Sequence, residues 1–499
     1  MIKVIKIHER DNVAVALQDM LKGEMISVDG TDLEIKGDIR KGHKVALKNL
    51  NENENVIKYG FVIGRTQMSI HAGSHIHSHN IKTTLSEESH YSYKPAGNIK
   101  NSPFHGAKRI FKGYKRINGT AGTRNEIWII NTVGCVNTSA ERLAKLANEK
   151  FNRQNFDGVF SFSHPYGCSQ LGGDHLNTQK ALRGLILNPN AGGVLVLGLG
   201  CENNQLKDLI ASLGDLDKSR LRSFNSQDVE DEIGEGLRLI EELFEVMKED
   251  SRTELPLSDL TLGMKCGGSD GLSGITANPL VGRITDKITD QGGSVILSEV
   301  PEMFGAEQLL MDRSIDRATF DKMVLMINSF KEYFLSHNQP VYENPSPGNK
   351  EGGITTLEEK SLGAIQKGGD SIVREVLDYG MQKGKKGLML LKAPGNDGVS
   401  STAMVASGAS LILFTTGRGT PLGFPVPTIK ISTNSELFLK KKSWIDFNAG
   451  ELLGGNLSWE EMTEKLLDFV IKVASGEIKT KNEINGYREI AVWKDGVTL

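Results

Sequence analysis

The sequence predicts an α/β protein with a small, mainly β domain at its N-terminus and a larger body of parallel-sheet α/β segments. From about residue 126 onward, continuous apolar strands alternate with amphipathic helices, which is typical of parallel sheets covered on both faces. The chain also has 55 glycines and only 6% aromatic residues, which favours tight strand-to-helix turns over a β-sandwich. Residues 1–85 instead contain short strands broken by turns.

The first domain is expected to cover residues 1–85. Its short strands are expected at 1–7, 24–30, 33–37, 43–49 and 55–64. Helical periodicity is scarce there, apart from 11–20 (DNVAVALQDM). Residues 86–108 are polar and turn-rich without periodicity, which predicts a linker.

The body is expected to consist of two α/β segments, 109–255 and 256–499. In the first segment, strands are expected at 126–133, 158–163 and 193–200, and each is followed by a helix. A long helix at 228–250 ends this segment. In the second segment, strands are expected at 260–265, 294–300, 387–392, 410–416 and 427–432, with a terminal helix at 458–475.

Length and charge limit the classes of function. A chain of 499 residues exceeds one ordinary core, so two or three domains are expected. Because 59 Lys and Arg nearly balance 62 Asp and Glu, no nucleic-acid or membrane-surface partner is expected, and a small neutral-to-acidic ligand is the simpler expectation. Without a signal peptide or a run of ~20 apolar residues, the protein is expected to be cytoplasmic. Whether the protein forms a homo-oligomer is left open by the sequence.

The four cysteines occupy similar positions along the chain. Cys135, Cys168, Cys201 and Cys266 each follow an apolar strand, and all have a glycine beside them. Because ligands bind outside the carboxyl ends of strands in open α/β sheets, the four thiols are expected to converge on one crevice and hold iron, or less favourably zinc. Inert buried thiols are the alternative, whereas disulfides are disfavoured in a cytoplasmic chain.

Other polar side chains follow the same strands. Among the polar residues that follow predicted strands, the candidates for ligand contact or proton transfer are His164, His175, Asn203, Asn396 and Arg418. An arginine between two glycines, as Arg418 is, suits a carboxylate, although a surface arginine in a turn fits this pattern equally well.

A histidine cluster lies at residues 71–80, HAGSHIHSHN. On an extended strand, His75, His77 and His79 share one face, because side-chain direction repeats every two residues. Three roles are open, in this order of preference: a lid that transfers protons, supplementary iron ligands, and an ordinary solvated strand.

Several long strings together resemble the altronate/galactarate dehydratase family. They include HIHSHN, GTRNEIWIINTVGC, SHPYGCSQLGGDH, VLGLGCENNQ, CGGSDGLSGITANP, SEVPEMFGAEQLL, YENPSPGNKEGGITTLEEKSLG and TTGRGTP. The resemblance spans nearly the whole chain, and the HIHSHN form is similar to the altronate branch. It implies an N-terminal SAF-type domain, ferrous iron (Fe²⁺), and dehydration of D-altronate to 2-dehydro-3-deoxy-D-gluconate in hexuronate breakdown.

This reaction removes a proton from C2, next to the carboxylate, and expels the C3 hydroxyl. A metal or an arginine stabilises the enediolate charge, while histidines suit the proton transfers. Arg124 and Arg418 are expected to bind the carboxylate, and Asn125, Asn203 and Asn396 the hydroxyls. The proton-transfer candidates are His75, His77, His164 and His175, followed by His43 and Lys44.

Three alternatives remain open from the sequence. The iron bound by Cys135, Cys168, Cys201 and Cys266 is either mononuclear or an iron–sulfur cluster with one iron open to substrate. The substrate is either altronate or another sugar acid such as galactarate. The protein is either an enzyme or a non-catalytic protein that binds sugar acids or metal.

Overall fold

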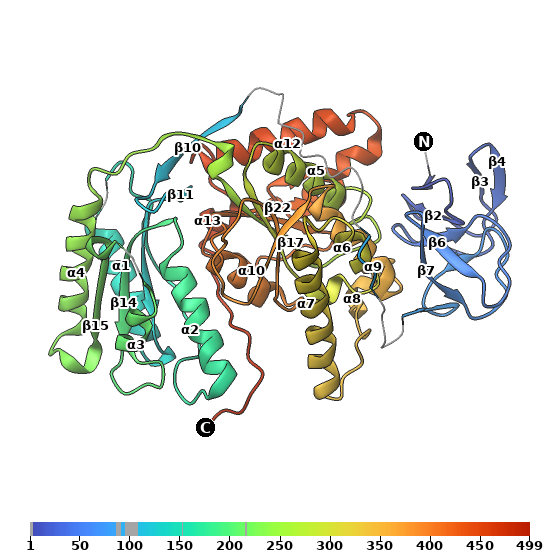
Figure 1. Cartoon of the computed structure of the whole chain (residues 1–499). Coiled ribbons are helices and arrows are strands. Elements are labelled where there is room, and N and C mark those ends of the chain that lie inside the picture. The colour runs from blue at the N-terminus through green and yellow to red at the C-terminus, as the bar shows by residue number, and fades with distance from the viewer. Residues whose placement is uncertain (1–2, 86–90, 95–107, 152, 215–216) are drawn as a thin grey trace.

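The computed structural model describes residues 3–85, 91–94, 108–151, 153–214 and 217–499, which form three regions (Figure 1). The N-terminal domain lies beside the C-terminal region, on the side away from the middle domain (Figure 1). Of the expected linker 86–108, residues 86–90 and 95–107 lie outside the described residues.

Described residues 3–85 form a mainly β domain, as predicted, and contain no helix. It contains two- to four-stranded sheets in the orders β1-β2-β5-β8, β3-β4 and β6-β7-β9. The strands are β1 (Val4–Ile5), β2 (Val13–Ala16), β3 (Met25–Val28), β4 (Thr31–Glu34), β5 (Lys44–Ala46), β6 (Asn55–Lys58), β7 (Phe61–Thr66), β8 (His75–Ile76) and β9 (Ile81–Lys82). The helical periodicity of 11–20 is misleading, because β2 is wholly buried between β1 and β5.

The middle domain is built on a four-stranded parallel sheet in the order β13-β12-β14-β15. Its strands are β12 (Glu126–Asn131), β13 (Gly158–Ser161), β14 (Ala191–Gly198) and β15 (Leu221–Asn225), and its helices are α1 (Asn137–Lys150), α2 (Gly172–Ile186), α3 (Leu206–Ala211) and α4 (Glu232–Met247). A smaller antiparallel sheet joins β10 (Ile110–Lys115) to β11 (Ala121–Gly122) and β16 (Thr253–Pro256).

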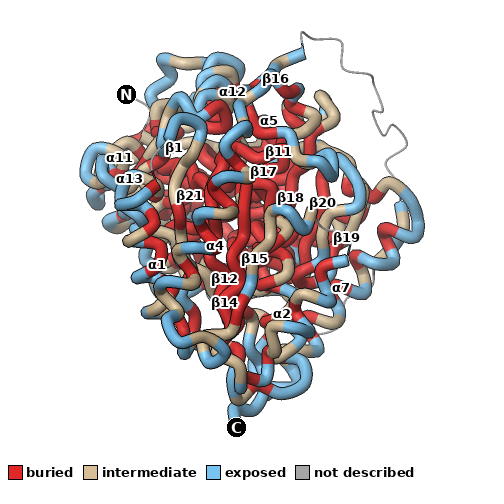
Figure 2. Tube along the Cα trace, turned by 90° about the vertical axis from the view of Figure 1, so that its left-hand side faces the viewer, coloured by how far each residue is buried: buried red, intermediate tan, exposed pale blue. Residues whose placement is uncertain are grey.

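The C-terminal region is built on a seven-stranded parallel sheet in the order β19-β20-β18-β17-β21-β22-β23. Its strands are β17 (Thr261–Cys266), β18 (Ser294–Leu297), β19 (Val373–Leu377), β20 (Gly387–Leu391), β21 (Leu411–Thr416), β22 (Thr428–Ser432) and β23 (Phe447–Asn448). Every residue of β17, β20, β21 and β22 is buried, which explains the continuous apolar runs; Figure 2 shows β17, β18 and β20 in the buried interior.

Nine helices of the described residues accompany this sheet. They are α5 (Ala277–Asp290), α6 (Glu307–Met311), α7 (Arg317–Ser336), α8 (Pro347–Glu351), α9 (Leu357–Ala364), α10 (Asp397–Ala406), α11 (Ser435–Lys440), α12 (Trp459–Ala474) and α13 (Lys481–Asn485). Helix α12, which corresponds to the helix expected at 458–475, begins at a capping box formed by Ser458 and Glu461, and the short helix α13 follows it. Nowhere in the described chain is a helix both long and apolar enough to cross a membrane.

The strand order contains a switch point at β17. From β17 the chain proceeds to β18 and β20 on one side, and later returns to β21 on the other side of β17. Connections that diverge in this way leave a crevice at the carboxyl ends of the two strands, which is where ligands bind in such sheets.

The C-terminal tail links the C-terminal region to the middle domain. Trp493 packs on Tyr333 of α7, with ring centroids 5.3 Å apart, and the Leu499 N–H donates to the Ser169 carbonyl at 3.0 Å. The seven residues from Trp493 to Leu499 make six steps of the chain, which span at most about 20 Å. The tail therefore brings Ser169, next to Cys168, within that distance of α7.

Candidate functional site

A crevice of about 460 Å³ opens at the carboxyl end of the seven-stranded sheet. The loops after β17, β18 and β20 form its walls, together with α7 and the segment before α8. Its polar lining includes Ser269, Glu302, Asn344, Lys360, Asn396 and Asp397. Asn396, which follows the strand β20, is therefore where the sequence predicts a ligand-binding side chain.

Buried Glu299 adjoins this crevice, because its carboxylate accepts from the N–H of the lining residue Cys266 at 3.2 Å. Its carboxylate accepts a hydrogen bond from Lys265 and a second from Lys367 at 3.0 Å. Although burial lowers the pKa of Lys265, the Glu299 carboxylate raises it above its usual value, so this lysine stays charged. The backbone of Glu299 is left-handed, with φ 71°, a strain that the surrounding structure must hold.

Cys266 is buried against this charged cluster. Its Sγ lies 2.7 Å from Lys367 Nζ and 3.2 Å from Glu302 Oε2. Burial, with the nearby Glu299 and Glu302 carboxylates, raises the pKa of the Cys266 thiol to about 12. The thiol is therefore protonated at neutral pH.

The ligand atoms of Cys266, Glu299 and Glu302 lie within 4.8 Å of one another, and no other such group of three is present among the described residues. By position they could hold a metal ion. However, Glu302 already pairs with Lys360 at 2.9 Å, and the Glu299 carboxylate forms ion pairs with Lys265 and Lys367. A divalent cation would face three ammonium groups, so these carboxylates are better matched to lysines than to a metal.

The short helix α8 connects this crevice to the rest of the site. Asn349 forms a capping box with Ser346, and its amide donates to the Ser269 carbonyl at 2.8 Å. Lys360 also donates to the Asn349 side chain at 3.1 Å. The helix is thereby held over the loop that follows β17.

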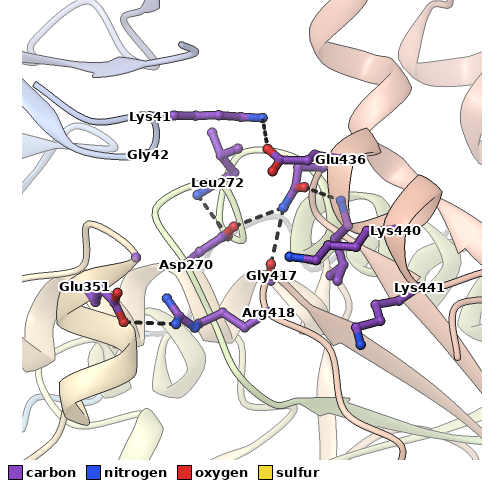
Figure 3. Close-up of a pocket in the computed structure, with 13 residues that line it drawn as sticks. Lys41, Gly42, Asp270, Leu272, Glu351, Gly417, Arg418, Glu436, Lys440 and Lys441 are labelled. Carbon is purple, nitrogen blue, oxygen red and sulfur yellow. Dashed lines mark hydrogen bonds and ion pairs between the residues drawn. The ribbon is translucent and has the colours of Figure 1, made fainter. Parts of the chain in front are cut away.

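A second crevice, of about 390 Å³, opens at the switch point on the other side of α8. Figure 3 shows Arg418 pointing toward Glu351 of α8, with which it forms an ion pair at 2.9 Å, and Lys41 of the N-terminal domain facing Glu436. Lys440 and Lys441 also line the crevice (Figure 3). Four cations thus face three carboxylates, those of Asp270, Glu351 and Glu436, which leaves a small excess of positive charge for an anionic ligand.

Half-buried Asp270 adds hydrogen-bonding groups to this second crevice. Its carboxylate accepts from Thr433 Oγ1 at 2.9 Å and from the Leu272 N–H at 3.1 Å. Burial raises the pKa of Asp270 above its usual value. The crevice therefore combines exposed cations with a half-buried polar floor.

The histidines of the N-terminal domain meet the C-terminal end of α8. His43 Nε2 lies 3.0 Å from the Glu351 carbonyl, and His77 Nε2 lies 2.8 Å from the Lys350 carbonyl. A carbonyl only accepts, so both Nε2 atoms carry protons. His43 Nδ1 lies 2.9 Å from His75 Nε2, which must donate to it when both rings are neutral.

Burial, followed by the charges of His43, His77 and His79, lowers the pKa of His75 to about 3, so its ring is neutral at pH 7. Its Nδ1 is then a free base. Because Arg418 and His43 both contact Glu351, the histidine cluster and the cationic crevice adjoin the same residue of α8.

The other three thiols lie at the carboxyl edge of the middle-domain sheet. Cys135, Cys168 and Cys201 are all exposed and follow β12, β13 and β14, which are neighbours in the order β13-β12-β14. Backbone hydrogen bonds join their loops, from the Gly134 N–H to the Tyr166 carbonyl and from the Asn204 N–H to the Gly167 carbonyl. The convergence of all four thiols on one crevice stays a prediction, since Cys266 follows the C-terminal sheet while the three exposed thiols follow the middle-domain sheet.

The structure does not bring Arg124 and Asn125 to any of these sites. Buried Arg124 pairs with Glu483 at 2.6 Å and donates to the Val473 carbonyl, while Asn125 accepts from Arg116. Both residues precede β12 rather than follow it, so they lie at the amino edge of the sheet. Their assignment to the substrate is corrected to a structural role.

The remaining predicted residues surround the thiol edge. His164 is buried with both ring nitrogens engaged, to the Asn131 carbonyl and the Tyr166 N–H, so it serves the loop rather than proton transfer. Asn203 accepts from the Ser169 N–H at 2.8 Å, next to Cys168. His175 lies on α2, and its buried Nε2 has no hydrogen-bond partner in the described chain.

Comparison with known proteins agrees with this architecture. The chain matches the family models for the D-galactarate/altronate dehydratase C-terminal region at residues 257–498, the D-galactarate dehydratase/altronate hydrolase second domain at 113–248, and the altronate/galactarate dehydratase SAF domain at 2–84. It is 52% identical to altronate dehydratase of Bacillus subtilis (strain 168) over 99% of both chains, and 51% identical to that of Escherichia coli (strain K12) over 99% of both. The chain belongs to the altronate/galactarate dehydratase family.

More distant relatives of this family member differ in substrate or in chain organisation. Galactarate dehydratase (L-threo-forming) of Escherichia coli (strain K12) is 35% identical over 98% of this chain and 96% of its own. Subunit beta of (2R)-sulfolactate sulfo-lyase from Chromohalobacter salexigens is 31% identical over 395 residues, 77% of this chain and 97% of its own. The alpha subunit from that organism is 48% identical over 65 residues, 13% of this chain and 69% of its own.

Sequence reasoning missed most of the charged groups around Cys266. Lys360 and Lys367 lie on or just after α9, in a stretch without a strand end before it. Lys265 directly precedes the predicted ligand Cys266. A lysine at the end of an otherwise apolar strand was the one feature of the sequence that could have indicated a buried charged group. Pairing to carboxylates distant in sequence was not readable from any local pattern.

Proposed function

We propose that this protein dehydrates D-altronate to 2-dehydro-3-deoxy-D-gluconate and water. The observation that carries the proposal is the 52% identity to an altronate dehydratase over 99% of both chains. The cationic crevice at the switch point supports it further, because the substrate is a small carboxylate. Three tasks must be performed: binding the carboxylate, removing the C2 proton and protonating the departing C3 hydroxyl.

In this proposal the substrate lies in the cationic crevice. Arg418 binds the carboxylate, because a guanidinium presents two parallel N–H groups to it and stabilises the charge that develops on C2 deprotonation. Arg418 must exchange its exposed ion pair with Glu351 for the substrate, which costs little because such pairs are weak. Thr433 and Asn434 hold Asp270 against the floor, where it can accept a substrate hydroxyl.

The histidine cluster carries the proton transfers in this proposal. His75 is neutral at pH 7, as a base must be, but the burial that holds its pKa near 3 also weakens its basicity, so the substrate-bound site must raise this pKa for His75 to act. His77 carries its proton on Nε2, toward the Lys350 carbonyl, which orients the ring. Because both histidines come from the N-terminal domain, this domain contributes to the reaction rather than serving only as a support.

The iron that the family resemblance implies suits the thiol edge better than the buried Cys266 cluster. Cys135, Cys168 and Cys201 are exposed, lie on neighbouring strands, and provide soft sulfur ligands of the kind that iron–sulfur clusters use. Iron held there could supply a Lewis acid, but the thiol edge belongs to the middle-domain sheet, whereas the crevice that holds the substrate in this proposal belongs to the C-terminal sheet, so no contact between iron and substrate is assigned. Cys266, with a raised pKa and three lysines around it, is a poor ligand.

A substrate panel tests the proposal. Iron-loaded protein kept under anaerobic conditions is expected to convert D-altronate to a 2-keto acid faster than it converts galactarate. Faster turnover of galactarate would assign the other activity of the family, and binding of either acid without turnover would indicate a non-catalytic sugar-acid protein. His77→Gln is expected to lower kcat by about 10²–10⁴-fold, the usual contribution of acid–base catalysis, while exposed His71→Gln serves as the matched control.

A further inference from the structure

The N-terminal domain is attached to the body through a buried ionic contact. Lys44 Nζ lies 2.9 Å from Glu359 Oε2, and Lys58 Nζ lies 2.8 Å from Glu359 Oε1. The side chains of all three residues are at most 1% exposed. Lys44 also donates to the Gly353 carbonyl at 2.7 Å. Two cations of one domain thus enclose one carboxylate of the other.

Each partner of this contact depends on the other. A buried charge is tolerated only when it is paired and hydrogen-bonded, and removing one partner leaves the rest uncompensated. Glu359 has further support from the Thr355 hydroxyl at 2.7 Å, so the body holds its carboxylate in place. The surface of the body is therefore built to receive two lysines.

A second polar contact lies beside the first. Glu358 accepts hydrogen bonds from the Thr83 hydroxyl at 2.9 Å and from the Thr84 N–H at 2.6 Å. Thr356 on the body donates its hydroxyl to the Ile63 carbonyl. Adjacent residues of α9 and its N-terminus thus bind two different edges of the N-terminal domain.

The two surfaces also fit closely in shape. A Cβ atom at Gly271 would lie 1.9 Å from the Gly42 carbonyl oxygen, and one at Gly353 would lie 2.2 Å from it. These backbones approach only because neither carries a side chain there. The apolar core is continuous across the contact, since Ile63 and Ile81 belong to the same buried cluster as Leu357 of α9. Continuous apolar packing of this kind is typical of permanent subunit interfaces.

The relatives described above divide at a similar place. The beta subunit of sulfolactate sulfo-lyase aligns over 395 residues and the alpha subunit over 65, and these are two separate chains. The described body here begins at residue 108, and the N-terminal domain ends near residue 85. The longer alignment matches the size of the body, and the shorter one fits within the N-terminal domain.

We propose that the N-terminal domain is held on the body as a subunit would be, by the surface around Glu358, Glu359 and Gly353, and that the covalent connection through residues 86–107 is not needed to keep it there. The partner that fits this surface is an SAF-type domain that presents two lysines and a pair of threonines. This inference does not rest on the proposed activity, because it concerns assembly.

Cleavage of the folded full-length chain tests the proposal. A protease recognition sequence is inserted within residues 86–90, so that Tyr91 and Tyr93, which contact Glu307 and Phe320, stay on the body fragment. The protein is cut after purification, and the fragments are applied to a size-exclusion column at physiological salt. The two fragments are expected to elute together at micromolar concentration. Separate elution of the wild-type fragments would overturn the proposal. Because elution is measured without substrate, a failure of the proposed dehydratase activity does not affect the result.

Substitutions at the contact test which residues hold the two fragments together. In the cleaved protein, Glu359→Gln is expected to weaken association at least about 30-fold, because it leaves two buried lysines without a counter-charge. Glu436→Gln is the matched control, since its pair with Lys41 also joins the two domains but is largely exposed, and it should leave association unchanged. Equal weakening by both variants would contradict the assignment to the buried contact.

A second variant guards against misfolding of the body. Thr83→Val removes a hydroxyl from the N-terminal fragment and leaves the sequence of the body unaltered. The far-ultraviolet circular dichroism and the unfolding of the body fragment should therefore match wild type. Thr83→Val is expected to weaken association by a smaller factor than Glu359→Gln, because Glu358 keeps the Thr84 N–H. If neither Thr83→Val nor Glu359→Gln weakens association, the surface around α9 does not hold the domain.

Discussion

The two parallel sheets end in the same local motif but surround their thiols differently. At the edge of the middle-domain sheet, Cys135, Cys168 and Cys201 are exposed. At the edge of the C-terminal sheet, Cys266 is buried, 2.7 Å from Lys367 and 3.2 Å from Glu302. A strand followed by glycine and cysteine therefore does not determine what the thiol does. Its burial and its charged neighbours do.

The difference assigns distinct chemistry to the two edges. Three exposed thiols on neighbouring strands are available as soft sulfur ligands for a metal. The buried thiol is kept protonated by its surroundings and belongs to an ion-pair network of lysines and glutamates. The following predictions test whether this contrast holds.

Thiol labelling compares the two edges most directly. In iron-free native protein, Cys266 is expected to react with iodoacetamide about 1,000-fold or more slowly than an ordinary thiol, because burial raises its pKa to about 12 and leaves little thiolate at pH 8. Mass spectrometry of labelled peptides with time measures this. Cys135, Cys168 and Cys201 are the internal comparison, and equal labelling of all four would abolish the contrast.

The ion-pair network at the C-terminal edge should contribute strongly to stability. Glu299→Gln is expected to lower the free energy of unfolding by about 3–5 kcal/mol, because Lys265 and Lys367 lose their shared counter-charge while remaining buried. Urea denaturation measures the loss. Glu460→Gln removes an exposed partner of Lys287 and should change stability by less than about 1 kcal/mol. A similar small effect at Glu299 would show that the network does not stabilise this edge.

Iron content tests which edge holds the metal. Cys168→Ser is expected to reduce bound iron at least about tenfold. Loss of a residue that only supports a metal ligand already lowers metal affinity by this factor, and loss of the ligand itself should lower it at least as much. Cys266→Ser should retain its iron. Metal analysis and absorption spectra of anaerobically prepared proteins give this result separately from activity. Loss of iron in Cys266→Ser alone would move the site to the buried Cys266, Glu299 and Glu302 group.

The smallest expected effect concerns the histidines that adjoin the C-terminal edge. The folded state holds the pKa of His75 near 3, against 6.5 as the ordinary value. As pH falls from 6.5 toward 3, the unfolded chain binds a proton that the folded chain does not, so stability decreases. His75→Gln should therefore weaken the dependence of unfolding free energy on pH between 7 and 5. His71→Gln should leave it unchanged, and identical slopes in all three proteins would contradict the burial of His75.

Some of the site was predictable because strand ends are readable. Asn396 and Arg418 each follow an apolar run, and both line crevices at the carboxyl end of the seven-stranded sheet. Arg124 was misassigned since proximity to a strand says nothing about which end of it the residue occupies. It precedes β12, whereas ligand-binding loops follow strands.

Other parts of the site depend on contacts between distant segments. Lys44, a minor candidate in the sequence, turns out to bind Glu359, which lies 315 positions away. The histidines of the N-terminal domain contact the carbonyls of α8, which lie 308 and 273 positions further along the chain. Such pairings have no signal in local composition or periodicity.

By itself, the sequence determined the class of fold, the small β domain, the parallel sheets and the strand-end positions of all four cysteines. These features follow from periodicity and turn residues, which act over short stretches of chain. Only the tertiary structure decided that β17 joins a different sheet from β12, β13 and β14, and so which thiols are exposed and which is enclosed by lysines. The physical reason is that burial and electrostatic environment arise from packing between segments, whereas local sequence sets only where each segment turns.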